Sequence, residues 1–194
     1  MRIALTGTPG TGKSAVGREL RRLGFSVIDL NGLARRRGFL GRRDRARGTR
    51  EISIERLDGF LRRQAPCKAP VFYEGHVAHL LQVDRAVVLR CSPPTLRRRL
   101  AARRYRPEKV LENSLAEALD AITAESVARL GKRRVFELDT SRRKAAPVAA
   151  EIARMARRRF RGASRLRPGR IDWSDEVYRN AAYYARPGGG TGGR

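Results

Sequence analysis

Cysteine, acidic residues and long apolar runs are all scarce in this sequence. Its 194 residues include two cysteines, Cys67 and Cys91, which have no ligand partners at the spacing of a metal site. We therefore expect both to be small buried side chains in a reducing compartment, and we expect a cytoplasmic protein. No stretch approaches the roughly 18 apolar residues of a membrane-spanning helix, so we expect no membrane association. An apolar run at residues 3–5 leads directly into a glycine-rich motif, so we expect no signal peptide.

The scarcity of acidic residues leaves a large positive charge. The 44 lysines and arginines against 19 aspartates and glutamates give a net charge of +25. A field of this size attracts polyanions, and RNA is the commonest large polyanion in a cytosol. Arginine also greatly outnumbers lysine, as GC-rich coding alone would produce, so the charge has two open explanations. We expect Arg97, Arg98 and Arg99 to lie on a solvated or RNA-facing side of their helix.

Residues 7–14 read GTPGTGKS, which matches the pattern G-x-x-x-x-G-K-[ST] of a P-loop. Glycines let successive backbone N–H groups turn inward around phosphate oxygens, the lysine reaches the β- and γ-phosphates, and the hydroxyl contacts Mg²⁺. The apolar run at 3–5 predicts a strand before the loop, and apolar residues at helical spacing predict a helix over 15–23. The motif thus predicts an ATP site formed by Gly10, Thr11, Gly12, Lys13, Ser14 and the amide of Ala15, with Ser14 on Mg²⁺.

Strand and helix signals alternate along the chain, which predicts an α/β fold with a parallel sheet flanked by helices. Together with the P-loop, this pattern indicates a P-loop NTPase with a five-stranded parallel sheet. We expect the strands over 3–5, 25–30, 70–73, 86–89 and 135–138. We expect further helices over 54–63, over 94–131 with a break at Arg106-Pro107, and over 147–159. Residues 31–50 are rich in glycine and arginine and lack apolar periodicity, which predicts a mobile insert outside the core.

The end of the chain differs in composition from the first 160 residues. We expect residues 1–160 to form the P-loop domain and residues 161–194 to form a basic extension. The extension is predicted to contain a helix over 171–184, capped by Asp172 or Ser174, and a disordered glycine-rich end. One side of that helix carries Trp173, Val177, Ala181 and Tyr184. This side either packs on the core or docks a partner, and the cost of leaving aromatic rings in water favours packing on the core.

Several segments line up with one family of P-loop proteins. They are residues 5–14, 27–35 (VIDLNGLAR), 74–81 (EGHVAHLL) and 88–113, followed by Glu117-Ala118. Over residues 1 to about 155 the chain resembles the adenylate kinase isoenzyme 6 family, and its archaeal members look closest. These are atypical nucleoside monophosphate kinases that also act as ATPases in maturation of the small ribosomal subunit. The resemblance implies a nucleoside monophosphate kinase fold with a monophosphate-binding insert at about 29–52 and a lid at about 102–112.

The resemblance also assigns roles to residues of the insert and the lid. In the insert, Arg35 would bind the monophosphate, and Asp29 and Leu30 would border its pocket. In the lid, Arg103 matches an arginine that contacts the phosphates. A planar guanidinium suits a developing charge that two nucleotides share. Arg104 stands where the family usually has glycine, which brings the flexibility of the lid into question.

Two side chains of the segment EGHVAHLL would act on the nucleotide. Glu74 follows the third strand, where P-loop folds carry a Walker B carboxylate, and it would hold Mg²⁺ directly or through water. His76 matches the family histidine associated with ATP hydrolysis and would orient the attacking water or sense the product phosphate; a purely structural histidine is the alternative. For His79, on the next helical turn, we expect packing. Lys13, His76 and Arg103 form the catalytic set that the resemblance implies.

The resemblance implies an ATP:AMP phosphotransferase with ATPase activity that acts in maturation of the small ribosomal subunit and its rRNA. Its expected ligands are ATP, Mg²⁺ and AMP. Its expected transient partners are a platform protein of the small subunit and pre-ribosomal RNA, and its expected state is a monomer. One alternative is an ATP-dependent ribosome-assembly factor with vestigial kinase activity. Another is an unrelated P-loop small-molecule kinase, such as a sugar or shikimate kinase, against which the segment EGHVAH argues.

Overall fold

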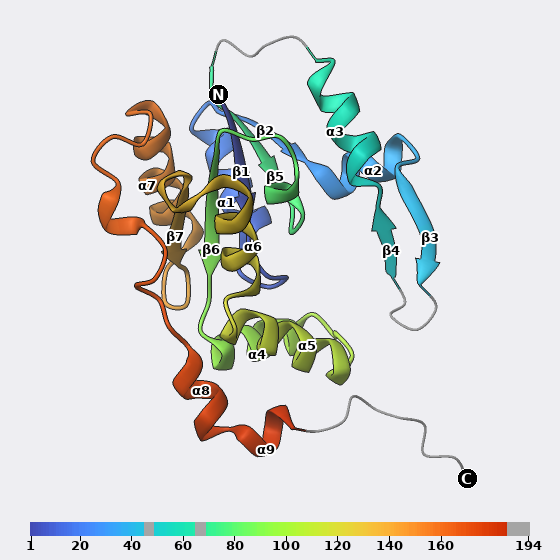
Figure 1. Cartoon of the computed structure of the whole chain (residues 1–194), viewed down its shortest axis with the longest axis vertical. Coiled ribbons are helices and arrows are strands. Elements are labelled where there is room, and N and C mark those ends of the chain that lie inside the picture. The colour runs from blue at the N-terminus through green and yellow to red at the C-terminus, as the bar shows by residue number, and fades with distance from the viewer. Residues whose placement is uncertain (45–48, 65–68, 186–194) are drawn as a thin grey trace.

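Five parallel strands form the centre of the molecule (Figure 1). The computed structural model describes residues 1–44, 49–64 and 69–185. The strands are β1 (Arg2–Thr6), β2 (Ser26–Asp29), β5 (Val71–Glu74), β6 (Arg85–Arg90) and β7 (Val135–Asp139). They lie side by side in the order β2-β5-β1-β6-β7. All five predicted strands and their parallel arrangement are confirmed.

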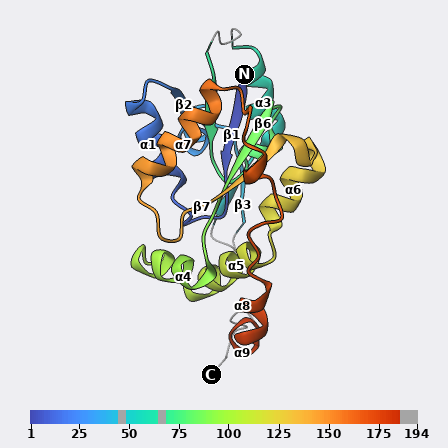
Figure 2. The same ribbon diagram turned by 90° about the vertical axis from the view of Figure 1, so that its left-hand side faces the viewer.

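Helices cover both faces of this sheet (Figure 2). One face is covered by α1 (Lys13–Arg22) and α7 (Ala145–Arg157), and the other by α2 (Leu30–Arg36), α3 (Ile54–Arg62) and α6 (Ala121–Leu130). Because side chains alternate along a strand, Ile3 and Leu5 pack toward α1 and α7 while Ala4 packs toward the opposite helices. All three side chains are fully buried. Burial on both faces explains why this strand is a continuous apolar run in the sequence.

Residues 31–50 contain more regular structure than the sequence predicted. They include most of α2 and the strands β3 (Leu40–Asp44) and β4 (Thr49–Ile52), which pair antiparallel with each other. Leu33 and Ala34 of α2 are buried in the core, so the prediction of an insert outside the core is wrong. A helix of seven residues makes only two turns, which is too short for a helical period to stand out in the sequence.

The long helical stretch after β6 is divided into three helices. These are α4 (Pro93–Ala102), α5 (Pro107–Ala118) and α6. The predicted break at Arg106-Pro107 is confirmed, but a second break at Leu119-Asp120 was not predicted. Asp120 has a φ of 54°, and its carboxylate accepts a hydrogen bond from Arg90. The turn contains neither glycine nor proline, so the sequence gives no local signal of it. The contact of Asp120 with Arg90 holds the turn instead.

The predicted helix over 171–184 is in fact two short helices, α8 (Ser174–Arg179) and α9 (Ala181–Tyr184), separated at Asn180. The backbone N–H of Ser174 donates to Asp172 Oδ1 at 2.8 Å, so Asp172 stabilises the start of α8 as predicted. Figure 1 shows both helices beside α4 and α5.

Arg97 of α4 holds this tail against the core. Its guanidinium forms an ion pair with Glu176 at 2.9 Å and donates to the hydroxyl of Tyr184 at 2.9 Å. It also lies 4.7 Å from the ring centre of Tyr183. The prediction that the tail helix packs within the chain is confirmed, and the prediction of a solvated Arg97 is wrong because these partners enclose it.

Three short 3₁₀ turns complete the described structure: η1 (Ala78–Leu80), η2 (Lys132–Arg134) and η3 (Ser164–Leu166). Across the ranges that the structure describes, no helix combines the length and apolar character needed to cross a membrane. Cys91 is buried, as predicted. Cys67 and the glycine-rich end lie outside the described residues.

Candidate active site

The loop between β1 and α1 has the conformation of a phosphate-binding loop. Gly10 and Gly12 have φ angles of 95° and 100°, in the left-handed region that favours glycine. A Cβ on Gly7 would stand 2.3 Å from the carbonyl oxygen of Leu89, and one on Gly10 would stand 2.8 Å from Leu96. The chain packing therefore requires glycine at Gly7 and Gly10. The loop ends in the N-terminus of α1, where free backbone N–H groups and the helix dipole attract anions.

Two threonines hold the loop in this shape. Thr11 is fully buried, and both its backbone N–H and its hydroxyl donate to the carbonyl oxygen of Thr8, at 3.2 and 2.9 Å. Both donors of Thr11 are thus engaged within the loop itself. Ala15 lies in the first turn of α1, where backbone N–H groups have no acceptor inside the helix. Thr11 and Ala15 were both predicted to bind the nucleotide. The donors of Thr11 are already engaged, whereas the Ala15 amide lies in the position that the motif requires.

Lys13 is buried at the base of the loop, with 9% of its surface exposed. Its ammonium group donates to the carbonyl oxygens of Gly7 and Thr8 at 2.6 and 3.0 Å. Burial lowers the pKa of Lys13 to about 8, and the nearby positive charge of Arg103 contributes in the same direction. Phosphate oxygens bound at the loop would offset the hydration that the Lys13 ammonium loses on burial. The site therefore favours binding of a polyanion.

Ser14 and Glu74 form a pair of oxygen donors beside the loop. The Ser14 hydroxyl donates to Glu74 Oε1 at 2.9 Å. Glu74 ends β5, is 6% exposed, and stands in register with Leu5 of β1 and Asp29 of β2. Mg²⁺ prefers oxygen ligands and uses one or two protein groups together with phosphates and water. The donor set fits Mg²⁺, and no larger cluster of histidine, cysteine and acidic side chains able to hold a metal occurs among the described residues.

The three predicted monophosphate ligands occupy different environments. Asp29 ends β2 next to Glu74 and precedes the first turn of α2. The side chain of Leu30 is fully buried and packs in the core, so it faces other apolar side chains. Arg35 is exposed near the end of α2. The structure therefore places Asp29 at the end of β2, on the P-loop edge of the sheet. Arg35 lies at the surface of α2, the helix that follows.

The two histidines after β5 differ in role. His79 is buried, with Nδ1 at 3.1 Å from the Thr6 hydroxyl and Nε2 at 2.9 Å from Glu125, so the predicted packing role is confirmed. His76 is exposed. Partial loss of hydration, and then the charges of Lys13 and His79, lower the pKa of His76 below its ordinary value. A neutral imidazole near Lys13 can accept a proton or a hydrogen bond from water.

Arg103 and Arg104 end α4 at the predicted lid. Arg103 is exposed and near enough to Lys13 for its charge to lower the pKa of that lysine. Arg104 has a φ of 57°, its N–H donates to Ala101, and the next N–H donates to Leu100. This is the helix end that usually carries glycine at the left-handed position, and the arginine there costs about 1 kcal/mol of backbone strain.

Arg99, which we expected to face solvent or RNA although it fits a recurrent arginine of the family, lies beside the P-loop. Its guanidinium donates to the carbonyl oxygens of Thr140, at 2.7 Å, and of Gly10, at 3.5 Å. The Thr140 hydroxyl in turn donates to the carbonyl oxygen of Thr11 at 2.8 Å. Arg99 thus ties α4 to the P-loop and to the end of β7, and the prediction of a solvated or RNA-facing Arg99 is wrong. Only Arg98 of that trio is exposed.

A buried charge network lies directly behind the loop. Arg90, at the end of β6, is 1% exposed and donates to Glu117 Oε1 at 2.8 Å and to Glu137 Oε1 at 2.5 Å, and it also pairs with Asp120. The other carboxylate oxygen of Glu117 accepts the Thr8 hydroxyl at 2.5 Å. Burial raises the pKa of Glu117, while Arg90 and Thr8 oppose that rise. The sequence analysis missed this network, although a charged residue inside or at the end of two apolar strands was a signal of it.

Comparisons with known proteins agree with this geometry. A model of the family described as an AAA domain matches residues 3–120, more than half of the chain. A protein of Methanocaldococcus jannaschii named "Putative adenylate kinase" is 36% identical over 179 residues, which cover 92% of this chain and 96% of the relative. A protein of Archaeoglobus fulgidus with the same name is 39% identical over 177 residues, covering 91% and 94%.

Solved structures with the same fold include small-molecule kinases. The shikimate kinase of Acinetobacter baumannii matches 81% of this chain and 93% of its own with a TM-score of 0.55 and 20% identity. TT1252 from Thermus thermophilus matches 81% and 97% with a TM-score of 0.54 and 22% identity. At this level of identity the likeness shows the fold alone, which is that of a P-loop kinase.

We predict that Lys13 takes up protons when nucleotide binds near pH 8. With a pKa of about 8, roughly half of the Lys13 side chains are neutral at that pH, and bound phosphates would raise the pKa. Binding should then take up about half a proton per protein, and affinity should fall as the pH rises further. Calorimetry in buffers of different ionisation enthalpy, with a non-hydrolysable ATP analogue, measures this uptake. Lys13→Arg is the control, because arginine stays charged; equal uptake in both proteins would contradict the prediction.

Replacing Arg90 by methionine is predicted to lower the free energy of unfolding by about 3–5 kcal/mol, because buried carboxylates lose their cation. The loss should shrink between pH 7.5 and pH 5, since Glu117 can take up a proton once its charge is uncompensated. Urea unfolding at both pH values measures this. The exposed Arg98→Met on α4 is the control and should cost less than about 0.5 kcal/mol. A small, pH-independent loss for Arg90→Met would show that the network is not stabilising.

Proposed function

The chain belongs to the P-loop family described as an AAA domain and to the group of archaeal relatives named for adenylate kinase, and from this membership we propose that it is an ATP:AMP phosphotransferase. The observation that carries the proposal is the set of groups at the start of α1. There, a buried Lys13 ammonium and the Ser14–Glu74 pair flank a glycine loop, an arrangement that supports phosphate binding. The relatives supply the choice of AMP as acceptor.

In this proposal the chain acts by positioning and by balancing charge. The loop amides and the N-terminus of α1 bind the triphosphate of ATP. Lys13 exchanges the carbonyl oxygens of Gly7 and Thr8 for phosphate oxygens, and Arg103 reaches the same phosphates from the end of α4. Ser14 and Glu74 would hold Mg²⁺, which supplies further neutralisation of phosphate charge when bound.

The acceptor side of the proposed site lies at β2 and α2. Asp29 stands in register with Glu74, so a monophosphate beside Asp29 would be close to the end of the triphosphate. Arg35, exposed on α2, is the proposed ligand of the monophosphate, and Leu30 shapes the pocket from the core through its backbone. Phosphoryl transfer requires the acceptor oxygen in line with the γ-phosphate, which this adjacency favours.

We propose ATP hydrolysis as a second activity of the same site. The exposed, neutral His76 supports it, because an imidazole near Lys13 can orient a water molecule. When AMP is absent, water would take the place of the acceptor. An ATPase with vestigial kinase activity remains the alternative that the kinase assay below tests.

The role in ribosome maturation is a further proposal, supported by the resemblance described above and by the net charge of +25. The purified chain should retain a platform protein of the small subunit in moderate salt, and nucleotide should change that retention. The measurement is a pull-down with purified platform protein, with and without the ATP analogue. Retention of bulk RNA alone, released uniformly by salt, would contradict a specific partner.

The kinase proposal predicts that ATP and AMP together yield ADP, and that Lys13→Ala lowers kcat/KM by about 100- to 1000-fold, because a cation at the phosphates is lost. A coupled assay for ADP and chromatography of the nucleotides measure both products. Lys132→Ala, an exposed lysine in η2, is the matched control and should keep full activity. ATP hydrolysis without conversion of AMP would favour the ATPase alternative, and phosphorylation of shikimate or a sugar in place of AMP would favour a small-molecule kinase.

A further inference from the structure

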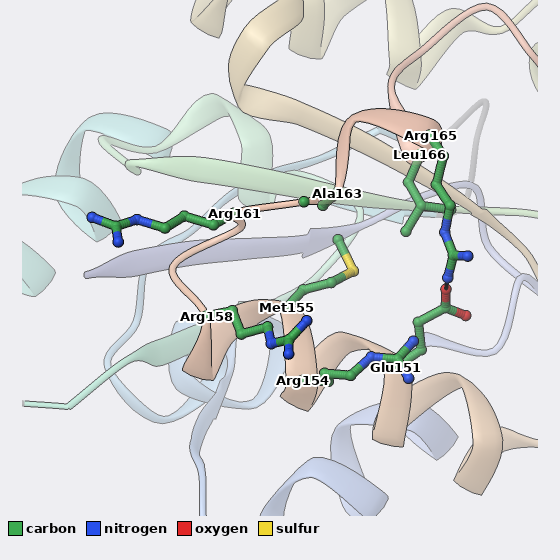
Figure 3. A pocket seen from close by; sticks show the side chains of 9 residues that line it. Glu151, Arg154, Met155, Arg158, Arg161, Ala163, Arg165 and Leu166 are labelled. Atoms are coloured by element: carbon green, nitrogen blue, oxygen red, sulfur yellow. Dashed lines mark hydrogen bonds and ion pairs between the residues drawn. The ribbon is translucent and has the colours of Figure 1, made fainter.

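A second basic site lies between the last turns of α7 and the segment that follows it. A cavity of about 440 Å³ separates these two parts of the chain, within residues 151–166 (Figure 3), and we name it the α7 groove. Its floor is apolar and includes Met155, Ala163 and Leu166. Its rim carries Arg154, Arg158, Arg161 and Arg165.

The α7 groove is at the opposite edge of the sheet from the P-loop. Arg157, beside it, donates to the carbonyl oxygen of Leu23, the residue that ends α1. The P-loop is at the other end of this ten-residue helix, about 15 Å away. Arg167 donates to the carbonyl oxygen of Lys132, just before β7 begins. The groove is therefore separate from the candidate active site.

A strained reversal of the chain builds the second wall of the α7 groove. Arg159 and Phe160 both have positive φ angles, 50° and 63°, which are rare for residues other than glycine. The N–H of Phe160 donates to Met155 at 2.7 Å, and its buried ring packs 4.8 Å from the ring of Phe136. Burial of this ring offsets the backbone strain. The reversal is thus a fixed feature of the fold that places residues 161–166 over α7.

Three of the four rim arginines of the α7 groove have no ion pair with a described carboxylate, and only Arg165 has one. Glu151, the one carboxylate among the described residues that line it, already pairs with Arg143 at 2.8 Å and Arg165 at 3.3 Å. Arg154, Arg158 and Arg161 are exposed, and none has an ion pair with a described carboxylate. The sequence from 154 to 170 contains eight arginines and no acidic residue. A positive potential of this kind attracts an external polyanion.

We propose that the α7 groove binds single-stranded nucleic acid through its phosphates. Figure 3 shows Arg161 and Arg165 toward opposite ends of the cavity, with Arg154 and Arg158 along one side. A single small anion is bound by guanidinium groups that converge on one point. These groups are instead spread along the groove, as successive phosphates of a strand require.

The apolar floor of the α7 groove selects an unpaired strand. Leu166 is half-buried and lies among exposed arginines, so unstacked bases can rest on guanidinium planes and on the exposed part of Leu166. In a duplex the bases are stacked and paired, so they cannot reach this floor. An acidic peptide without aromatic side chains would satisfy the arginines but would have no flat group to stack on their guanidinium planes. This proposal needs neither the kinase nor the ATPase activity, because the groove is on another edge of the sheet.

The test is the binding of a fluorescein-labelled RNA of about 12 nucleotides, measured by anisotropy without added nucleotide. Arg154→Glu with Arg158→Glu should weaken binding at least tenfold. Because each phosphate contact contributes about 0.7 to the salt dependence of a single strand, the slope of log K against log salt should become shallower by about 1.4. Arg154→Gln with Arg158→Gln should give a smaller loss of the same kind, and thermal unfolding checks that each variant is folded.

The matched control is Arg63→Glu with Arg98→Glu, which changes the net charge equally. Both arginines are exposed away from the groove, Arg63 directly after α3 and Arg98 on α4, and their replacement should weaken binding less than threefold. An equal loss in the control would overturn the proposal, because the charge would then act without a site. Equal affinity for a duplex of the same sequence, or equal competition by polyglutamate, would also overturn it. DNA of the same sequence distinguishes a site for RNA from one for either nucleic acid.

Discussion

The P-loop is held in place by a carboxylate that also neutralises the buried cation Arg90. Arg90 ends β6 with 1% of its surface exposed, and an unpaired guanidinium at that depth would be strongly destabilising. Glu117 and Glu137 approach it from α5 and β7. Glu117 also accepts the hydroxyl of Thr8, so the same carboxylate that neutralises Arg90 orients the loop. The central sheet, helix α5 and the P-loop therefore meet at one buried charge.

The two ends of helix α5 lie in different environments. Helix α5 is anchored at its end by Glu117, whereas the turn before its start, residues 103–106, is exposed. Arg103 belongs to this exposed turn, whereas Lys13 is buried at the base of the P-loop. The extension is joined to the same network, because the N–H of Gly169 donates to Glu137 Oε2 at 3.1 Å. A division of the chain at residue 160 thus separates segments that share one buried carboxylate.

Features that depend on neighbouring residues could be predicted from the sequence. Features that depend on contacts between distant residues could not. The glycine pattern of the P-loop and the apolar runs of the strands are local, and the structure contains the loop and all five strands. Arg90 and Glu137 are 47 residues apart, and nothing near either residue indicates that they meet. The turn at Asp120 and the half-buried position of Arg99 also depend on distant partners. A charged residue next to buried apolar ones is the signal that such a partner exists, but it does not identify the partner.

Coding bias can produce many arginines, but it does not explain how their partners are distributed. On the P-loop edge, Arg90 and Arg99 bind carboxylate or carbonyl oxygens from distant segments, so their charge is satisfied inside the chain. On the opposite edge, Arg154 and Arg158 line a groove whose one described carboxylate is already paired twice. Around Arg90 the neutralising carboxylates, Glu117 and Glu137, come from distant parts of the chain, whereas the described structure brings only the already paired Glu151 to the α7 groove. The arginines behind the net charge of +25 therefore differ in environment: some are neutralised inside the chain, whereas others have no ion pair with a described carboxylate.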